Sequence, residues 1–298
     1  MVAPMERSTI VAFVGVVVLG GVNGVSISIT NQEVPPLWGA TLRFGAAALL
    51  LFGLTAACRI ELPRGPALVG SLLYGLLYFG VGFGLIHWAL VAAPPGLTQV
   101  ILAVVPLAAL LLAVAHRVER FRWQGIGGAV LALAGVVVVF GDPIGGAVPI
   151  PSLLAVLGGA VAIAEGSVAV KRFPGSHPVA GNAVAMAVGA GLILVVSLLA
   201  GEPPVVPDTI RTWAALTYLV VVGSVVVFVL FLYVIARWTA SATSYVWPLL
   251  PLVAVPFSAL VLAEPVTPLL LAGGLLVVAG VYLGAFAPSI PRPAWLSG

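Results

Sequence analysis

The sequence predicts an all-α membrane protein of ten transmembrane helices, arranged as two inverted five-helix repeats. Three observations predict it: a very apolar composition, ten apolar segments of membrane-spanning length, and a motif that occurs twice at a fixed offset. Hydrophobic residues make up 62% of the 298 residues and charged residues 7%, with a mean hydropathy of +1.24. A soluble domain cannot bury that much apolar surface, so a lipid bilayer is the expected surrounding.

Ten apolar segments follow one another along the chain, each near the roughly 20 residues that a bilayer core requires. They cover residues 10–30, 36–57, 66–90, 96–115, 122–141, 151–170, 178–200, 212–236, 240–262 and 267–287. The segments lack the alternating polarity of a membrane barrel. An open sheet would leave backbone groups unsatisfied in lipid, so helices are expected throughout.

A motif in the fourth and fifth segments recurs in the ninth and tenth. The paired positions, each 145 residues apart, are Pro106 and Pro251, Glu119 and Glu264, Gly128 and Gly273, and Gly135 and Gly280. Because the chain crosses the bilayer an odd number of times between the copies, they should lie upside down relative to each other. We therefore expect a first repeat over 1–145 and a second over 146–298. Inverted repeats are typical of secondary transporters, whose site lies where the halves meet.

The basic residues predict the orientation. With the N-terminus on side A, ten Lys and Arg residues fall on side A, one (Arg211) falls on side B, and Arg43 lies inside the second segment. Since basic residues gather on the cytoplasmic side, side A is expected to be cytoplasmic and to hold both termini. The net charge of +3 is thus a topology signal, and no nucleic-acid partner is expected.

The sequence contains few of the residue patterns that an enzyme's active site would need. There is no nucleotide-binding P-loop motif, no His/Cys/carboxylate cluster with metal-ligand spacing, and a single cysteine, Cys58. No metal and no cofactor are expected. A membrane channel or facilitator for small solutes is an alternative to a carrier, and a membrane-embedded enzyme is a weaker one. The oligomeric state stays open.

Several motifs resemble those of the drug/metabolite transporter superfamily, specifically its EamA-type ten-helix members. The second segment carries Pro36-Leu37-Trp38 and Leu42-Arg43-Phe44, and the fifth and tenth end in Gly135-Val136 and Gly280-Val281. The resemblance covers nearly the whole chain. It implies a transporter of the inner or plasma membrane that exports small metabolites, often amino acids, by alternating access around a central cavity.

Two charged residues lie within apolar segments and are candidate functional groups. Arg43 is too deep for an ordinary loop position, so it should face the protein interior. It clamps an anionic substrate group, or it is a structural cation that binds helix-end carbonyls or snorkels outward. Glu165 in the sixth segment is a candidate for proton coupling, because burial favours the neutral form of a carboxyl group. Its alternative role is a contact with the basic residues near its helix end.

The remaining candidates are polar or aromatic residues on a presumed central path. For substrate binding they are Asn23, Tyr74, Tyr78, His87, Trp88, Tyr245 and Trp247, beside Arg43. Core packing is an equally good explanation for any single aromatic ring. Proline frees backbone groups within a helix, so the candidate kinks or gates are Pro106, Pro248, Pro251 and Pro256.

Overall fold

The structure is a computed structural model that describes residues 6–93, 95–139, 148–262 and 268–287. Within these ranges every regular element is helical, and the helices form ten membrane-spanning segments, here called spans. Three spans contain a π-helical segment, labelled η. In chain order the spans are α1–α2 (Arg7–Gly21, Asn23–Thr30), α3 (Pro36–Ala57), α4–η1–α5 (Pro66–Tyr74, Gly75–Phe83, Gly84–Ala89), α6–α7 (Pro95–Leu102, Val105–Ala115), α8 (Trp123–Val139), α9 (Ile150–Arg172), α10 (Pro178–Leu199), α11–η2–α12 (Ile210–Val220, Val221–Val226, Val227–Arg237), α13–α14 (Ala240–Thr243, Val246–Leu262) and α15–η3 (Pro268–Val281, Tyr282–Phe286).

Length and apolar composition explain why these segments form spans. Seven helices are long and apolar enough to cross a membrane, and two shorter apolar helices cover Trp123–Val138 and Leu271–Phe286. Proline stands at the first or second position of several helices, where its missing N–H costs nothing. Large apolar side chains such as Leu49 and Leu199 point outward, 75% and 84% exposed. This outer surface suits contact with lipid chains.

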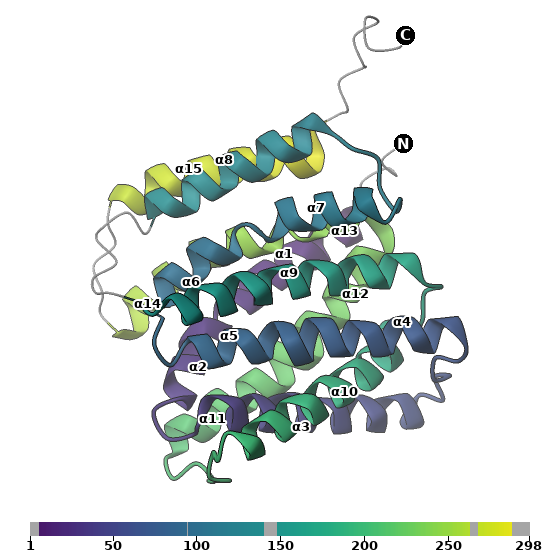
Figure 1. Cartoon of the computed structure of the whole chain (residues 1–298), viewed down its shortest axis with the longest axis vertical. Helices are drawn as coiled ribbons and strands as arrows, with labels where there is room; N and C mark the ends of the chain where they lie inside the picture. The colour runs from purple at the N-terminus through teal and green to yellow at the C-terminus, as the bar shows by residue number, and fades with distance from the viewer. Residues whose placement is uncertain (1–5, 94, 140–147, 263–267, 288–298) are drawn as a thin grey trace, which may run out of the picture.

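The ten-helix bundle is built from repeat-related helix pairs. The second span, α3, packs along the seventh, α10, while the fifth, α8, packs along the tenth, α15. The α8–α15 pair forms one end of the bundle, and α3, α10 and α11 lie at the other (Figure 1). The start of α1 and the end of η3 share one face, because the rings of Phe13 and Phe286 are 6.2 Å apart. We call this face side A and the opposite face side B.

The recurrent glycines of the repeat motif bring α8 and α15 into backbone contact. A Cβ built on Gly128 would lie 2.6 Å from the carbonyl oxygen of Gly280, and one on Gly280 would lie 2.6 Å from the carbonyl oxygen of Gly128. Gly135 meets Gly273 in the same way, at 2.7 Å. Small residues of this kind let membrane helices approach closely. The glycine spacing is thus explained by packing between the halves. Glu264, the partner of Glu119 in the motif, lies outside the described residues.

Two glutamates brace side B. Glu202 accepts hydrogen bonds from the backbone N–H groups of Leu37 (3.2 Å) and Trp38 (2.7 Å) at the start of α3. Glu33, in the turn between α2 and α3, accepts from the backbone N–H of Asp208 (2.8 Å) and from the Thr209 hydroxyl before α11. The Thr209 hydroxyl is the main cause that lowers the pKa of the Glu33 carboxyl to about 2. Each glutamate thus holds a helix start in the other half of the chain.

The α8–α15 contact gives a prediction about stability. Gly128→Leu should lower the melting temperature in detergent strongly, because the new side chain would collide with the α15 backbone; overpacking of this kind costs about 1–3 kcal/mol or more. Gly191→Leu is the matched control, since a Cβ on Gly191 meets nothing within 4 Å. Thermal unfolding followed by fluorescence measures both. Equal melting temperatures for the two variants would contradict the packing argument.

Candidate functional site

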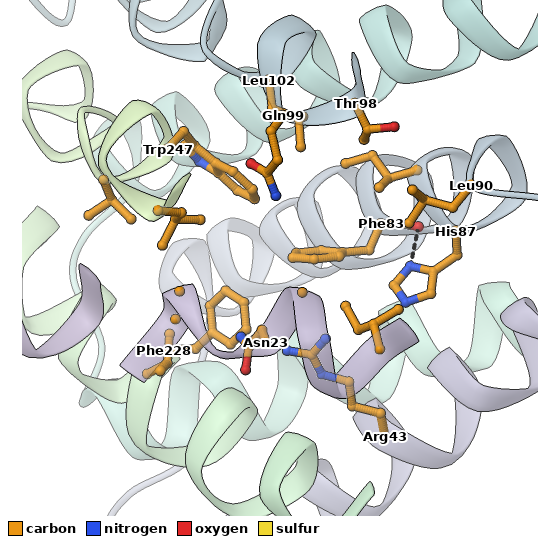
Figure 2. Close-up of a pocket in the computed structure, with 18 of the residues that line it drawn as sticks. Asn23, Arg43, Phe83, His87, Leu90, Thr98, Gln99, Leu102, Phe228 and Trp247 are labelled. Carbon is orange, nitrogen blue, oxygen red and sulfur yellow. Dashed lines mark hydrogen bonds between the residues drawn. The ribbon is translucent and has the colours of Figure 1, made fainter. Parts of the chain in front are cut away.

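A cavity of about 320 Å³ lies between the two halves of the bundle. Its lining comes from the first, second, third, fourth, eighth and ninth spans (Figure 2). The described lining residues are Val16, Gly20, Gly21, Asn23, Gly24, Ile27, Ser28, Asn31, Arg43, Tyr78, Phe83, Ile86, His87, Leu90, Thr98, Gln99, Leu102, Val227, Phe228, Phe231, Val246, Trp247 and Leu250. Asn31 and Leu90 belong to the side B ends of their spans, so the cavity extends toward side B.

A break in the first span places Asn23 on the cavity wall. The helix pauses at Val22, between α1 and α2, and Asn23 begins the second piece. The Asn23 Nδ2 donates to the carbonyl oxygen of Gly223, 3.2 Å away. Gly223 has to be glycine here, because a Cβ at that position would overlap the Asn23 amide oxygen. Asn23 Oδ1 is buried and has no hydrogen-bond partner among the described residues.

Arg43 is the one fully charged side chain among the described lining residues, and it is 1% exposed. Its Nε donates to the Ser224 hydroxyl (2.8 Å) and its Nη2 to the Gly223 carbonyl oxygen (3.0 Å). Both acceptors belong to η2, and π-helical turns are frequent at functional sites. The guanidinium also lies 4.9 Å from the Phe44 ring centroid. Nη1 is buried and has no partner in the part of the chain that the structure describes.

His87 lies beside Arg43, and a hydrogen bond to its own helix fixes the tautomer of its neutral ring. Its Nδ1 is 2.8 Å from the carbonyl oxygen of Phe83, and that oxygen can only accept. In the neutral ring the proton is therefore on Nδ1, which leaves a lone pair on Nε2. The rings of Tyr78, Phe83, Phe228, Phe231 and Trp247 form an aromatic part of the lining, and the Phe83 ring lies 5.8 Å from the Arg43 guanidinium carbon. The site thus combines a cation, neutral acceptors and an apolar surface.

The structure brings five of the eight predicted binding residues together at the cavity: Asn23, Arg43, Tyr78, His87 and Trp247. The other three lie outside the described lining of this cavity. Tyr74 is buried behind the cavity, with its ring 4.9 Å from that of Tyr78. Trp88 follows His87 directly, so it points away from the cavity, 46% exposed. Tyr245 donates its hydroxyl to the Gly125 carbonyl oxygen (2.9 Å) and packs between α8 and η3.

Some site groups were missed by sequence reasoning. Gln99 and Thr98 line the cavity from α6, and Gly223 and Ser224 hold Arg43 from η2. The signal for Thr98 and Gln99 was weak: two polar residues near the start of the fourth segment, three and four positions after Pro95. The local sequence around Gly223 contains no pattern that predicts a π-helix.

Glu165 and the prolines lie away from the cavity lining. The Glu165 Oε1 is 2.8 Å from the His116 Nε2, so the pair joins α9 to the end of α7 near side A. Pro106 is the second residue of α7, just after a break in the fourth span at 103–104. Pro248 lies in the first turn of α14, and Pro251 and Pro256 lie inside that helix.

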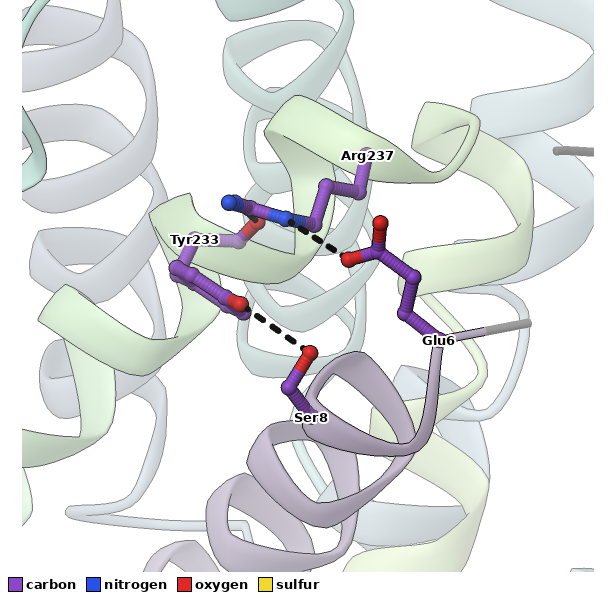
Figure 3. Close-up of polar contacts among 4 residues, drawn as sticks. All are labelled: Glu6, Ser8, Tyr233 and Arg237. Carbon is purple, nitrogen blue, oxygen red and sulfur yellow. Dashed lines mark hydrogen bonds and ion pairs between the residues drawn. The ribbon is translucent and has the colours of Figure 1, made fainter. Parts of the chain in front are cut away.

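Dense contacts close the bundle between the cavity and side A. Figure 3 shows Arg237 stacked over the Tyr233 ring, 3.6 Å from its centroid, and paired with Glu6 at 3.8 Å. The Tyr233 hydroxyl donates to the Ser8 hydroxyl at 3.3 Å. Deeper in the bundle the rings of Phe13, Trp238 and Phe286 form a cluster, with centroids 5.1–6.2 Å apart. These contacts connect α1 with α12 and η3.

The comparisons with known proteins agree with this architecture. The profile of the EamA-like transporter family matches residues 7–141 and again 150–285. A probable amino-acid metabolite efflux pump of Salmonella typhimurium is 26% identical over 95% of this chain and 96% of its own length. A probable terminal-alkyne amino-acid exporter of Streptantibioticus cattleyicolor is 30% identical, covering 80% of this chain and 84% of its own.

Further matches support the same assignment. The uncharacterized inner membrane transporter YedA of Escherichia coli is 28% identical over 74% of this chain and 72% of its own length. A solved structure titled "Crystal structure of protein" superposes with a TM-score of 0.79 at 22% identity, covering 93% of this chain and 96% of that one, which shows a shared fold. With its ten apolar spans and two profile matches, the chain belongs to the EamA-like transporter family and is a membrane transporter rather than an enzyme.

Proposed function

We propose that this transporter exports small amphipathic metabolites, and amino acids in particular, by alternating access of the central cavity. The observation that carries the proposal is Arg43: a buried guanidinium at the cavity wall whose Nη1 has no partner among the described residues. Guanidinium groups bind carboxylates well, and every amino acid carries one. The names of two relatives, a probable amino-acid metabolite efflux pump and a probable terminal-alkyne amino-acid exporter, support the same substrate class.

Alternating access would use the two halves, 1–145 and 146–298, as the moving bodies. The cavity extends toward side B, while the cluster of Phe13, Trp238 and Phe286 closes side A. The opposite state would have to break the side A contacts and close the side B end. Breaks at 103–104, before Pro106, and at 244–245, before Pro248, interrupt the fourth and ninth spans and are the proposed hinges. A channel would need no such exchange of closed ends.

Arg43→Lys should raise the half-saturating concentration for amino-acid exchange by about tenfold or more, because a point charge cannot bind Ser224, Gly223 and a substrate carboxylate at once as the planar guanidinium can. Counterflow of radiolabelled leucine into liposomes measures it, with Arg211→Lys, an exposed arginine of side B, as the control. An unchanged affinity for leucine in Arg43→Lys would exclude a role of Arg43 in substrate binding. Flux that does not saturate in the wild type would favour the channel alternative.

Glu165 and His116 form the proposed proton-coupling pair. Uptake of a proton by Glu165 would remove its negative charge, and with it any ion pair with a protonated His116, and so loosen α9 from the end of α7. We expect Glu165→Gln to abolish the stimulation of net flux by a pH gradient while exchange without a gradient continues. Glu61→Gln, at an exposed glutamate on the same side, is the control. A gradient response that persists in Glu165→Gln would exclude coupling through this residue.

The proposed orientation places side A, with its basic residues, in the cytoplasm. Cys58 at the end of α3 is exposed on side A, so it serves as a native probe. A membrane-impermeant maleimide should leave Cys58 unlabelled in intact cells and label it once the membrane is opened. Val206→Cys in a Cys58→Ser background, on side B and 66% exposed in the wild type, should be labelled in intact cells. The reverse labelling pattern would show that side A faces the outside and side B the cytoplasm.

A further inference from the structure

The cavity has an unusual balance of charge. Arg43 contributes a positive charge, and no Asp or Glu occurs among the described residues that line the cavity. The groups that hold the guanidinium, the Ser224 hydroxyl and the Gly223 carbonyl, are neutral. The positive charge is therefore solvated by dipoles but not compensated. Charges interact far more strongly in such a low-dielectric setting than in water.

Neutral acceptors lie next to the cation. Asn23 Nδ2 and Arg43 Nη2 donate to the same oxygen, that of Gly223, which leaves Asn23 Oδ1 buried and without a described partner. In the view of Figure 2 the guanidinium lies between Asn23 and His87, whose Nε2 holds a lone pair in the neutral ring. Gln99 offers another acceptor, because its Oε1 is buried without a partner among the described residues.

Most of the remaining lining is apolar, and Ser28, Asn31 and Thr98 add uncharged polar groups. The rings of Tyr78, Phe83 and Trp247 lie within 6.5 Å of one another, centroid to centroid, and aliphatic side chains such as Leu102 and Leu250 complete the surface. A volume of about 320 Å³ admits a ligand of amino-acid size. A charged side chain on the ligand would meet no counter-charge on this wall.

From these features we infer that the cavity selects by charge: it takes zwitterions and monoanions with an uncharged side chain, and it rejects net cations. The carboxylate binds Arg43 through Nη1, and the ammonium group donates to Asn23 Oδ1 and His87 Nε2. A net cation would place a second positive charge in the cavity with Arg43. This inference rests on the proposed function and names the substrate class of the same site.

Competition for labelled leucine counterflow tests the selection. The competitors share a skeleton and differ in charge: norleucine against lysine, and leucine against leucinamide and 4-methylpentanoate. Lysine and leucinamide should compete about tenfold or more weakly than norleucine, while 4-methylpentanoate should still compete. Lysine or leucinamide within about twofold of norleucine would overturn the inference.

A binding measurement separates the inference from the proposed function. If the wild type exchanges no leucine, the amino-acid claim fails, and thermal stabilisation of the purified protein by the same compounds still tests charge selection. Stabilisation by 4-methylpentanoate or norleucine but not by leucinamide would support it. Equal stabilisation by all of them, or by none, would overturn it.

Asn23→Asp tests whether Arg43 and Asn23 set the charge selection, because it places a carboxylate beside Arg43 and neutralises the cavity. The preference for norleucine over lysine should fall by about tenfold. Gln32→Glu is the matched control: it adds the same charge at an exposed position outside the lining. Equal shifts in both variants would mean that overall charge near side B sets the preference, and would overturn the assignment to Arg43 and Asn23. Correct folding of each variant is checked by its melting temperature.

Discussion

A guanidinium inside a lipid-embedded helix bundle has no bulk water to solvate it, so the protein must supply its partners. Arg43 obtains them from one short π-helical segment, through the Gly223 carbonyl and the Ser224 hydroxyl. A carbonyl oxygen has two lone pairs, so the Gly223 oxygen can accept from a buried side chain besides any backbone N–H. The second span of one half thus buries its charge against η2 in the eighth span of the other. The cavity forms where these spans meet.

The same contact constrains the first span. Asn23 reaches the Gly223 oxygen only because α1 stops at Gly21 and α2 resumes at Asn23, and because Gly223 leaves room for the amide. At the α8–α15 pair the halves also meet through small residues, as in the Gly128 and Gly280 contact. Polar contacts thus join the halves at the cavity and at side B, while the remote helix pair adds close backbone packing.

The fold follows from the sequence almost completely, because long apolar segments in lipid have only helices open to them. Arg43 was predictable for a related reason: a charge in the middle of an apolar segment must face inward. Helical faces were harder to assign. His87 lines the cavity and its neighbour Trp88 faces outward, a difference of one position that residue type alone does not reveal. The partners of Arg43 could not be found, since they depend on contacts across about 180 residues of sequence and on a π-helix without a local signature.

Side A and side B of the bundle are held by different chemistry. Side A is closed by rings and by exposed, long side chains such as Arg237 and Glu6, whose pairing contributes little because water competes for it. The side B brace instead joins Glu33 and Glu202 to backbone N–H groups of the opposite half. Both sets of contacts are formed in this structure, so the proposed alternating access would require the side A contacts to break. The aromatic cluster of Phe13, Trp238 and Phe286 is therefore the larger energetic obstacle to opening side A. In the proposed orientation this cluster separates the cavity that carries Arg43 from the cytoplasm.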